Sequence, residues 1–235
     1  MDTATLSCSV ALLKEETLLS EMTLNIKKTH SERLMPLIDN LLSESERERE
    51  ELGAVAASAG PGSFTGLRIG ISTARGLAQG LGIPAVPVCT LEAMAEALPT
   101  PGALVCPLLD ARRSQVYTAL FCRDELEPYN LKTLIEPRAM ALSELTGALK
   151  ESTGPVVFTG EGLQSYEVQL KEALGSRAVL LPAPFRLCRA ALVALRGRAL
   201  LEKNPQASYL ELLPSYLRRP EAERLAAEKE GGAES

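Results

Sequence analysis

The segment from residue 57 to residue 84, ASAGPGSFTGLRIGISTARGLAQGLGIP, has the glycines and hydroxyls of a loop that could bind phosphate. The positions concerned are Gly60, Gly62, Ser63 and Thr65. Free backbone N–H groups at the start of a helix attract anions. However, Leu67 stands where a Walker A motif requires lysine, and Thr65 stands where the dinucleotide fingerprint requires its third glycine. We therefore favour a tight strand-to-helix turn, with Gly60 and Gly62 at positive φ, over a phosphate site.

Histidine, a frequent metal ligand and proton carrier, occurs once in the chain, at His30. Two imidazoles therefore cannot share one metal. We identify no Ser/His/Asp or Cys/His catalytic set, because a single histidine leaves little to build one from. We predict no catalytic residue, no metal site and no cofactor. His30 itself is interpreted as a capping or packing residue at a helix start.

The run after the glycine loop has glycines spaced four residues apart, at Gly66, Gly70, Gly76 and Gly80. Each glycine inside a helix costs about 1 kcal/mol relative to alanine, so four of them need a reason. Gly70, Thr73, Ala74 and Leu77 would share one face of this helix. The small face either packs on the chain's own sheet or contacts another subunit, and the spacing leaves both interpretations open.

Composition narrows the class of protein. The chain has 235 residues, 46% of them hydrophobic and 23% charged, with a net charge of −5. That length suits two packed lobes. The negative net charge disfavours a protein that binds nucleic acid on its own. Five scattered cysteines, none in a C-x-x-C pair, indicate buried, reduced thiols in a cytoplasmic protein. The sequence has no apolar run of membrane-spanning length and no signal-peptide pattern at its start.

Hydrophobic periodicity predicts an α/β order in both lobes. The first lobe, residues 1–100, is expected to hold a hairpin at 7–26, helices at 31–43, 66–81 and 91–98, and strands before residue 60 and at 82–88. The second, residues 101–219, is expected to hold strands near 103–109, 114–123, 130–136, 155–160 and 178–182, with helices near 142–151, 163–173 and 186–202. One possibility for the last helix is that it packs back on the first lobe. Residues 220–235 are predicted to be disordered.

Two local signals mark the helix at 31–43. Thr29 and Glu32 have capping-box spacing, and Pro36 is assigned to the first turn, where proline is tolerated. Leu34 and the apolar residues three, four, seven and eight positions after it form an amphipathic stripe.

Together these segments resemble the TsaB (YeaZ) family, a subunit of the bacterial machinery that makes threonylcarbamoyladenosine in tRNA. The resemblance rests first on ASAGPGSFTGLRIGISTARGLAQGLGIPAVPVCTLEAMA. It extends through DTATLSCSVALL, HSERLMPLIDNLL, LDARRSQVY and LLPSYLRRPEAE, in the family's order, to about residue 222. It implies an α/β fold in two lobes of the actin/Hsp70/sugar-kinase (ASKHA) type.

The resemblance also implies a role without catalysis. The related catalytic subunit, TsaD, carries a metal on an N-H-x-E-x-H motif that follows a similar glycine segment. Here the aligned stretch is CTLEAM, with Thr90 and Met94 at the histidine positions and only Glu92 retained. The implied partners are a TsaD-type catalytic subunit and a TsaE-type ATPase, with tRNA reached only through the complex and a homodimer when the chain is alone.

The partner surface implied by the family is the face made by the helices at 31–43 and 66–81. The residues predicted to bind the partner are Leu34, Leu37, Ile38, Leu41, Gly66, Arg68, Gly70, Thr73, Ala74 and Arg75.

The alternative function is an ATP-dependent phosphotransferase or nucleotide-binding protein of the same fold. It would use the glycine loop as a phosphate loop together with Asp2, which matches a magnesium-supporting aspartate of related kinases. A second carboxylate, Asp110, matches the family's DAR segment and has Arg112 and Arg113 beside it. We favour a structural ion pair for both aspartates. A metal-dependent peptidase is disfavoured by the missing histidines. A basic strip for tRNA is weighed against a solvated helix face, and its members are Arg186, Arg189, Arg196 and Arg198.

The chain departs from the family at one place. Family members usually carry several apolar residues before the aspartate, forming the first half of a central strand, whereas here Met1 precedes Asp2 directly. The sequence therefore predicts either a start upstream or a central strand that lacks half of its length.

Overall fold

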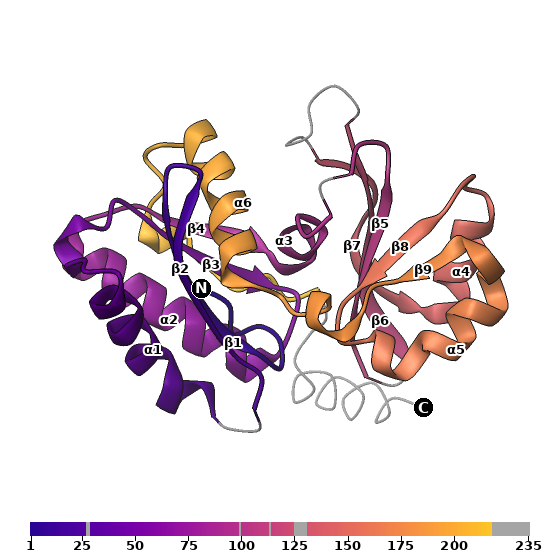
Figure 1. Ribbon diagram of the computed structural model, residues 1–235, viewed down its shortest axis with the longest axis horizontal. Coiled ribbons are helices and arrows are strands. Elements are labelled where there is room, and N and C mark those ends of the chain that lie inside the picture. The colour runs from indigo at the N-terminus through magenta and orange to yellow at the C-terminus, as the bar shows by residue number, and fades with distance from the viewer. Residues whose placement is uncertain (27–28, 99, 113, 125–130, 218–235) are drawn as a thin grey trace, which may run out of the picture.

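Two lobes of mixed α/β structure lie side by side in the computed structural model, which describes residues 1–217 except 27–28, 99, 113 and 125–130 (Figure 1). The predicted tail at 220–235 lies outside the described residues. The elements of the first lobe are β1 (Cys8–Lys14), β2 (Thr17–Leu24), α1 (His30–Glu44), η1 (Arg49–Glu51), β3 (Val55–Gly60), α2 (Phe64–Leu81), β4 (Ala85–Cys89) and α3 (Thr90–Ala95). Every helix and strand predicted for this part of the chain is therefore present.

The second lobe is built on one five-stranded sheet in the order β7-β6-β5-β8-β9. Its elements are β5 (Leu104–Asp110), β6 (Gln115–Arg123), β7 (Leu131–Ala141), α4 (Leu142–Lys150), β8 (Val156–Thr159), α5 (Leu163–Leu174), η2 (Gly175–Arg177), β9 (Ala178–Leu180) and η3 (Ala183–Phe185). β5, β8 and β9 run parallel, whereas β6 pairs antiparallel with both β5 and β7. This mixed sheet with flanking helices agrees with the predicted fold class.

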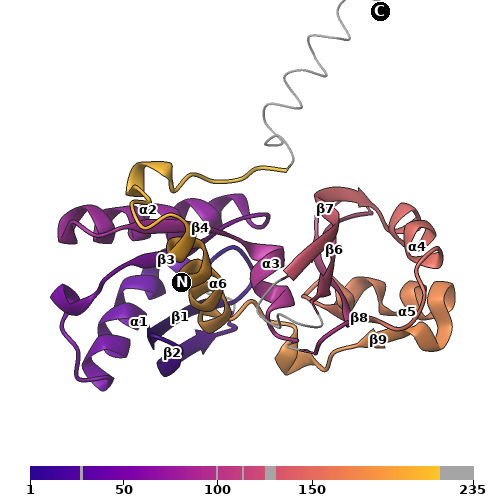
Figure 2. The same ribbon diagram turned by 90° about the horizontal axis from the view of Figure 1, so that it is seen from above.

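The last helix, α6 (Ala190–Lys203), crosses back to the first lobe and packs on β1, β3 and β4. Gly197 allows this approach, because a methyl group added there would overlap the side chain of Ala56 in β3. After α6, the chain forms η4 (Tyr209–Glu211) and then runs along α2 (Figure 2). The first lobe is thus completed by the C-terminal part of the chain.

The first lobe's sheet is split. β1 and β2 form one antiparallel pair, β3 and β4 form one parallel pair, and residues at the N-terminus bridge the two pairs. Asp2 exchanges two backbone hydrogen bonds of 2.9 Å with Ser9, while the carbonyl of Met1 accepts from the N–H of Ser58 at 3.1 Å. Met1 and Asp2 therefore join β1 to β3 across the split.

Helix α1 differs in detail from its prediction. Thr29 is the N-cap residue, but its side chain makes no capping hydrogen bond, so the predicted capping box does not form. The helix begins at His30, which places Pro36 beyond the first turn and inside the helix. Proline there removes one helical hydrogen bond. Burial of the apolar stripe beginning at Leu34 against β1 and α2 offsets that cost.

The two lobes share a hydrophobic core around α3. Leu91 and Met94 of α3 pack in one cluster with Val105 and Phe121 of the second lobe and with Val193 of α6. All five side chains are buried. A continuous apolar core of this kind fixes the orientation of two lobes more firmly than a polar contact surface would.

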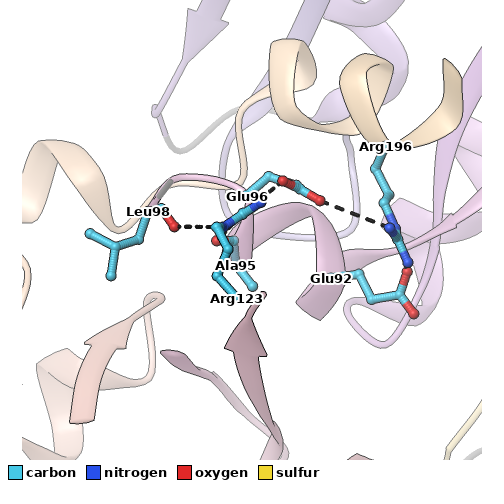
Figure 3. Close-up of polar contacts among 6 residues, drawn as sticks. All are labelled: Glu92, Ala95, Glu96, Leu98, Arg123 and Arg196. Atoms are coloured by element: carbon cyan, nitrogen blue, oxygen red, sulfur yellow. Dashed lines mark hydrogen bonds and ion pairs between the residues drawn. The ribbon is translucent and has the colours of Figure 1, made fainter. Parts of the chain in front are cut away.

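A buried ion pair crosses the same junction (Figure 3). Arg123 at the end of β6 donates to Glu96 at 2.8 Å and to the carbonyl of Leu98 at 3.0 Å, and both charged side chains are almost completely buried. Arg196 of α6 donates to Glu92 at 2.8 Å and lies 4.0 Å from Glu96. Three segments that are distant in sequence are therefore held together at the base of α3.

We expect Glu96→Gln to lower the free energy of unfolding by about 3 kcal/mol, because it removes the charge of one partner in a buried pair. The matched control is Glu202→Gln, which alters an exposed pair with Arg198 and should cost no more than about 0.5 kcal/mol. Urea denaturation followed by circular dichroism measures both variants. Equal stabilities for the two variants would show that the junction does not depend on this pair.

Candidate functional site

The glycine loop between β3 and α2 is covered by the chain's own N-terminal segment. The N–H of Ser63 donates to the carbonyl of Ala4 at 2.7 Å, and the hydroxyl of Thr3 donates to the carbonyl of Gly66 at 2.8 Å. Methyl groups added at Gly62 or Gly66 would overlap the carbonyl oxygens of Ala4 and Thr3, respectively. These glycines are therefore required for the close approach of two backbones.

The other side of the loop is covered by the segment after η4. The N–H of Ser215 donates to the carbonyl of Ala59 at 2.7 Å, and a methyl group added at Gly60 would overlap the carbonyl oxygen of Ser215. Tyr216 follows, with its ring 5.1 Å from that of Phe64 and its hydroxyl 3.2 Å from Nε of Arg68. The position of this segment at the loop was not predicted from the sequence.

The tight-turn interpretation fits this geometry, with one correction. Gly60 has φ of +125°, as predicted, but Gly62 is not among the residues with positive φ. Gly62 is needed for the space that Ala4 occupies. Ser63 caps α2 by accepting from the N–H of Gly66 at 3.2 Å, and Thr65 is exposed. The hydroxyl and N–H of Ser63 are thus engaged within the chain.

Asp2 is fully buried and shapes the segment that covers the loop. Its carboxylate accepts from the N–H of Ala4 at 3.2 Å and from the hydroxyl of Thr5 at 2.9 Å, so it closes a turn over residues 2–5. Burial raises the pKa of Asp2 above its usual range, although these hydrogen bonds act in the opposite direction. Asp2 organises the backbone rather than facing solvent where a metal–phosphate complex would need it.

Glu161 is a site residue that sequence analysis missed. Its carboxylate accepts from the N–H of Leu6 at 3.0 Å and so joins the second lobe to the N-terminal segment. Burial raises its pKa, and the nearby charges of Asp2 and Asp110 raise it further. The sequence did contain a signal, because Glu161 lies between two glycines. The structure explains the first of them: a methyl group added at Gly160 would overlap a backbone carbonyl.

Asp110 lies at the exposed end of β5 and accepts from the N–H of Arg112 at 2.7 Å. This contact is a turn hydrogen bond from a backbone N–H, whereas the sequence led us to expect an ion pair. Arg113, the second arginine of the motif, lies outside the described residues. The charges of Asp2 and Asp110 both act on Glu161. Among the described residues, however, no group of three or more His, Cys, Asp or Glu side chains could hold a metal ion.

The positions that would carry the metal-binding histidines are filled by buried residues without that chemistry. Thr90 and Met94 have 0% and 1% of their surfaces exposed. The hydroxyl of Thr90 has no hydrogen-bond partner among the described residues, but a hydroxyl and a thioether are poor ligands for a divalent metal. Glu92, the retained carboxylate, pairs with Arg196 (Figure 3). The residues present do not fit the metal of the catalytic relative.

Most of the predicted partner-binding residues lie inside the chain. Leu34, Leu37, Ile38 and Leu41 of α1 are buried against β1 and α2. Gly66, Gly70 and Ala74 of α2 are also buried, the two glycines facing Thr3. These seven therefore have almost no surface to offer, because they form the lobe's own core. Arg68 is exposed, and Thr73 and Arg75 are partly exposed.

The predicted basic strip is neutralised by carboxylates. Arg186 lies 3.4 Å from Glu167, and Nε of Arg189 donates to Glu21 at 2.9 Å. Arg196 pairs with Glu92 as described. Arg198 lies 3.0 Å from Glu202 and 3.5 Å from Glu16. The strip is therefore a set of ion pairs and not a surface of unbalanced positive charge.

All five cysteines are free thiols, but not all are buried as expected. Cys8, Cys106 and Cys188 are buried, whereas Cys89 and Cys122 are half-buried. Burial raises the pKa of Cys106 to about 12 and that of Cys8 and Cys89 to about 11, so these thiols stay protonated at neutral pH. No helix within the described residues is long and apolar enough to cross a membrane.

Comparison with known proteins gives consistent matches. A family model described as "TsaD: tRNA N6-adenosine threonylcarbamoyltransferase" matches residues 17–225. The tRNA threonylcarbamoyladenosine biosynthesis protein TsaB of Bacillus subtilis is 32% identical over 95% of this chain and 94% of its own length. TsaB of Escherichia coli is 36% identical over 78% of this chain and 80% of its own. The solved structure of YeaZ from Pseudomonas aeruginosa superposes with a TM-score of 0.75 at 28% identity, covering 92% of this chain and 97% of that one.

We expect Gly66→Ala to destabilise the chain by about 1–3 kcal/mol, because the new methyl group must displace the backbone of Thr3. Gly76→Ala is the matched control in the same helix, where the methyl group meets open space and should stabilise by up to about 1 kcal/mol. Thermal and urea unfolding measure the difference. If Gly66→Ala is as stable as Gly76→Ala, the N-terminal segment does not lie on the loop.

The buried amine of Met1 gives a pH dependence. Its pKa is lowered from 8.0 to about 6, chiefly by burial, so the folded chain binds fewer protons there than the unfolded chain. The free energy of unfolding should therefore rise by about 2–3 kcal/mol between pH 6 and 8 from this group. The Nα-acetylated chain, which has the same His30 and no titrating amine, should lack that rise. Parallel pH profiles for the two forms would contradict the prediction.

Proposed function

The chain belongs to the TsaB (YeaZ) family of tRNA threonylcarbamoyladenosine biosynthesis proteins, and we propose that it is a non-catalytic subunit. In this role it binds a TsaD-type catalytic subunit and enables that subunit to transfer threonylcarbamoyl to the adenosine next to the anticodon of tRNA. The family match supports a role in tRNA threonylcarbamoyladenosine biosynthesis. The residues at the candidate site support a subunit that leaves catalysis to its partner.

One observation carries the non-catalytic role: the places where a related enzyme holds its reactive groups are occupied by this chain's own structure. Thr3 and Ala4 cover the glycine loop, and Thr90 and Met94 replace the two histidines. Glu92 is engaged by Arg196. A catalytic site needs preorganised groups facing a substrate, and these groups face one another.

The outer surfaces of α1 and α2 form the proposed docking face for the catalytic subunit and for a second copy of this chain. The helices contact each other along one side of the first lobe (Figure 1), and their buried stripes leave polar and small residues outside. The exposed or partly exposed residues proposed for this face are Pro36, Asp39, Arg68, Ser72, Arg75 and Gly76. This assignment moves the docking face from the buried stripe to the opposite side of the same two helices.

We propose that tRNA is bound through the complex and not by this chain alone. The net charge is −5, and each arginine of the α6 region is paired with a carboxylate. Nucleic-acid affinity depends on unbalanced positive charge that can replace counterions, which these paired arginines do not provide. Assembly with a TsaE-type ATPase and a cytoplasmic place of action stay predictions from the family resemblance.

Reconstitution tests the proposal directly. A TsaD-type subunit, a TsaE-type ATPase, ATP, threonylcarbamoyl-adenylate and unmodified tRNA are combined with and without this chain, and the modified adenosine is measured by mass spectrometry. We expect product only when the chain and the TsaD-type subunit are both present. Product from this chain alone, or product that does not depend on it, would refute the proposal.

A pair of open helix glycines locates the docking face within the same assay. Gly76→Leu adds a large side chain to the outer face of α2, and Gly147→Leu does the same on α4 in the second lobe. Neither site has atoms within 4 Å of the added carbon, so both variants should fold. We expect only Gly76→Leu to weaken binding to the TsaD-type subunit, by at least about tenfold, or about 1.4 kcal/mol, in calorimetry. Equal binding by both variants would place the docking face elsewhere.

A further inference from the structure

A groove with a volume of about 380 Å³, which we call the acidic groove, lies beside the glycine loop. The first lobe contributes residues 59–61 and the end of β4, and the second lobe contributes residues 136–137 of β7. The third wall is the segment after η4, which runs from α2 towards β7 (Figure 2). The volume lies in the range of pockets that bind ligands, so the groove has room for a side chain or a small molecule.

The segment after η4 presents alternate side chains to the acidic groove. Leu213, Ser215 and Leu217 line the groove. Tyr216, between the last two, packs instead against the aromatic ring at the start of α2. A period of two residues is that of an extended chain. The N–H of Ser215 donates to the carbonyl of Ala59 at 2.7 Å, so the glycine loop holds this wall of the groove in place.

Much of the lining of the acidic groove is apolar. Three prolines from separate segments join the two leucines of the extended wall, and they are Pro61, Pro87 and Pro137. Proline has no backbone N–H, so these positions offer no donor to an anion. They offer instead a surface on which an aliphatic chain can pack and leave water.

Three glutamates from three different segments line the same groove: Glu92, Glu136 and Glu211. Arg196 already pairs with Glu92 at 2.8 Å. Glu136 and Glu211 are exposed, and neither forms a hydrogen bond or an ion pair with a residue that the structure describes. In the described part of the chain, no lysine or arginine lines the groove. The groove therefore carries an excess of negative charge, which attracts a cation and repels a phosphate.

The arrangement of these glutamates selects an organic cation over a metal ion. Among the residues that the structure describes, no three acidic, histidine or cysteine side chains are placed to hold a metal ion. A guanidinium group has five N–H donors in a planar fork, so it can bond carboxylates that lie on different sides of it. The aliphatic stem of arginine packs on apolar surface while its head stays with the charges. An arginine side chain therefore matches both the glutamates and the prolines of the groove.

The surroundings of the acidic groove favour an arginine that is carried by a polypeptide. Leu213 in its wall has 56% of its surface exposed, and two neighbours of lining residues, Leu210 and Tyr216, are exposed as well. A free amino acid would leave these apolar side chains in water. A protein segment that places an arginine in the groove covers them with its flanking residues. Arginine and tyrosine are also enriched among the residues that carry most of the binding energy in protein interfaces.

We propose that the acidic groove binds an arginine side chain from an apolar segment of a partner protein. Glu136 of the second lobe and Glu211 of the C-terminal segment attract its guanidinium group, and the prolines hold its stem. Because these glutamates come from different parts of the fold, the groove is complete only when β7 and the segment after η4 lie side by side. The inference makes no use of the outer surfaces of α1 and α2, so it does not rest on the proposed function.

Titrations of the full chain followed by amide NMR test this proposal. The probes are the peptide acetyl-Gly-Leu-Arg-Leu-Gly-amide, the same peptide with glutamine in place of arginine, and argininamide. The glutamine peptide lacks the charge, and argininamide lacks the apolar flanks. We expect the arginine peptide to shift the amide signals of Ser215 and Leu217 and to bind at least about tenfold more tightly than either of the other probes.

A pair of variants then assigns the charge. Glu136→Gln combined with Glu211→Gln should weaken binding of the arginine peptide at least about fivefold, because it removes both uncompensated carboxylates. The matched control is Glu172→Gln, which neutralises an exposed glutamate of α5 outside the groove and should leave the affinity unchanged. All three positions are exposed, so the variants should fold, which circular dichroism checks.

Four results would overturn the proposal. The first is equal binding of the two peptides, and the second is an affinity that the double variant leaves unchanged, since either shows that charge is not recognised. The third is equal binding of argininamide and the arginine peptide, which would assign the groove to a free small amine. The fourth is binding that occurs only after Arg218→Gln and Arg219→Gln are introduced, which would assign the groove to the chain's own C-terminal arginines. None of these readouts depends on tRNA modification.

Discussion

The passage of residues 1–6 across the centre of the first lobe is the constraint on which the rest of the structure depends. Within six residues the backbone bridges β1 and β3, covers the glycine loop and reaches the second lobe. The buried carboxylate of Asp2 fixes the turn that makes these contacts possible. Glycines at 62, 66 and 70 are then a consequence of this packing, since each leaves room for Thr3 or Ala4.

This constraint also explains how a chain can keep the fold of an enzyme family while the groups at its candidate site bond to the chain itself. A glycine loop binds phosphate only if its N–H groups are free and directed outward. In this chain Ser63 uses its N–H on Ala4 and its hydroxyl on Gly66. Around α3, the retained Glu92 is drawn into the ion pairs at the lobe junction. The loop groups therefore stabilise the first lobe itself, whereas Glu92 contributes to the junction between the lobes.

Sequence periodicity predicted the elements well because the amphipathic stripes are strong. The stripe of α1 and the largely buried runs of β5 and β6 are determined by burial alone. What it could not predict is which partner each apolar or small face meets. Leu34 and Gly70 suit a subunit contact as well as an internal one, and only the path of residues 1–6 and the packing of β1 decide between them. Glu161 and Ser215 were missed for the same reason, because each contacts a residue, Leu6 or Ala59, more than a hundred positions away in the sequence.

Both ends of the described chain pack on the first lobe. The sheet of this lobe therefore depends on contacts with segments from both ends. β1 and β3 are held together by Met1 and Asp2 on one side and by α6 on another. The helices α1 and α2 must therefore close over a sheet whose centre is thin. The apolar stripes of both helices are buried against this sheet, so only the outer, polar surfaces of the helices remain for association. A surface of that composition favours an exchangeable contact over a permanent one, which suits the subunit role that we propose.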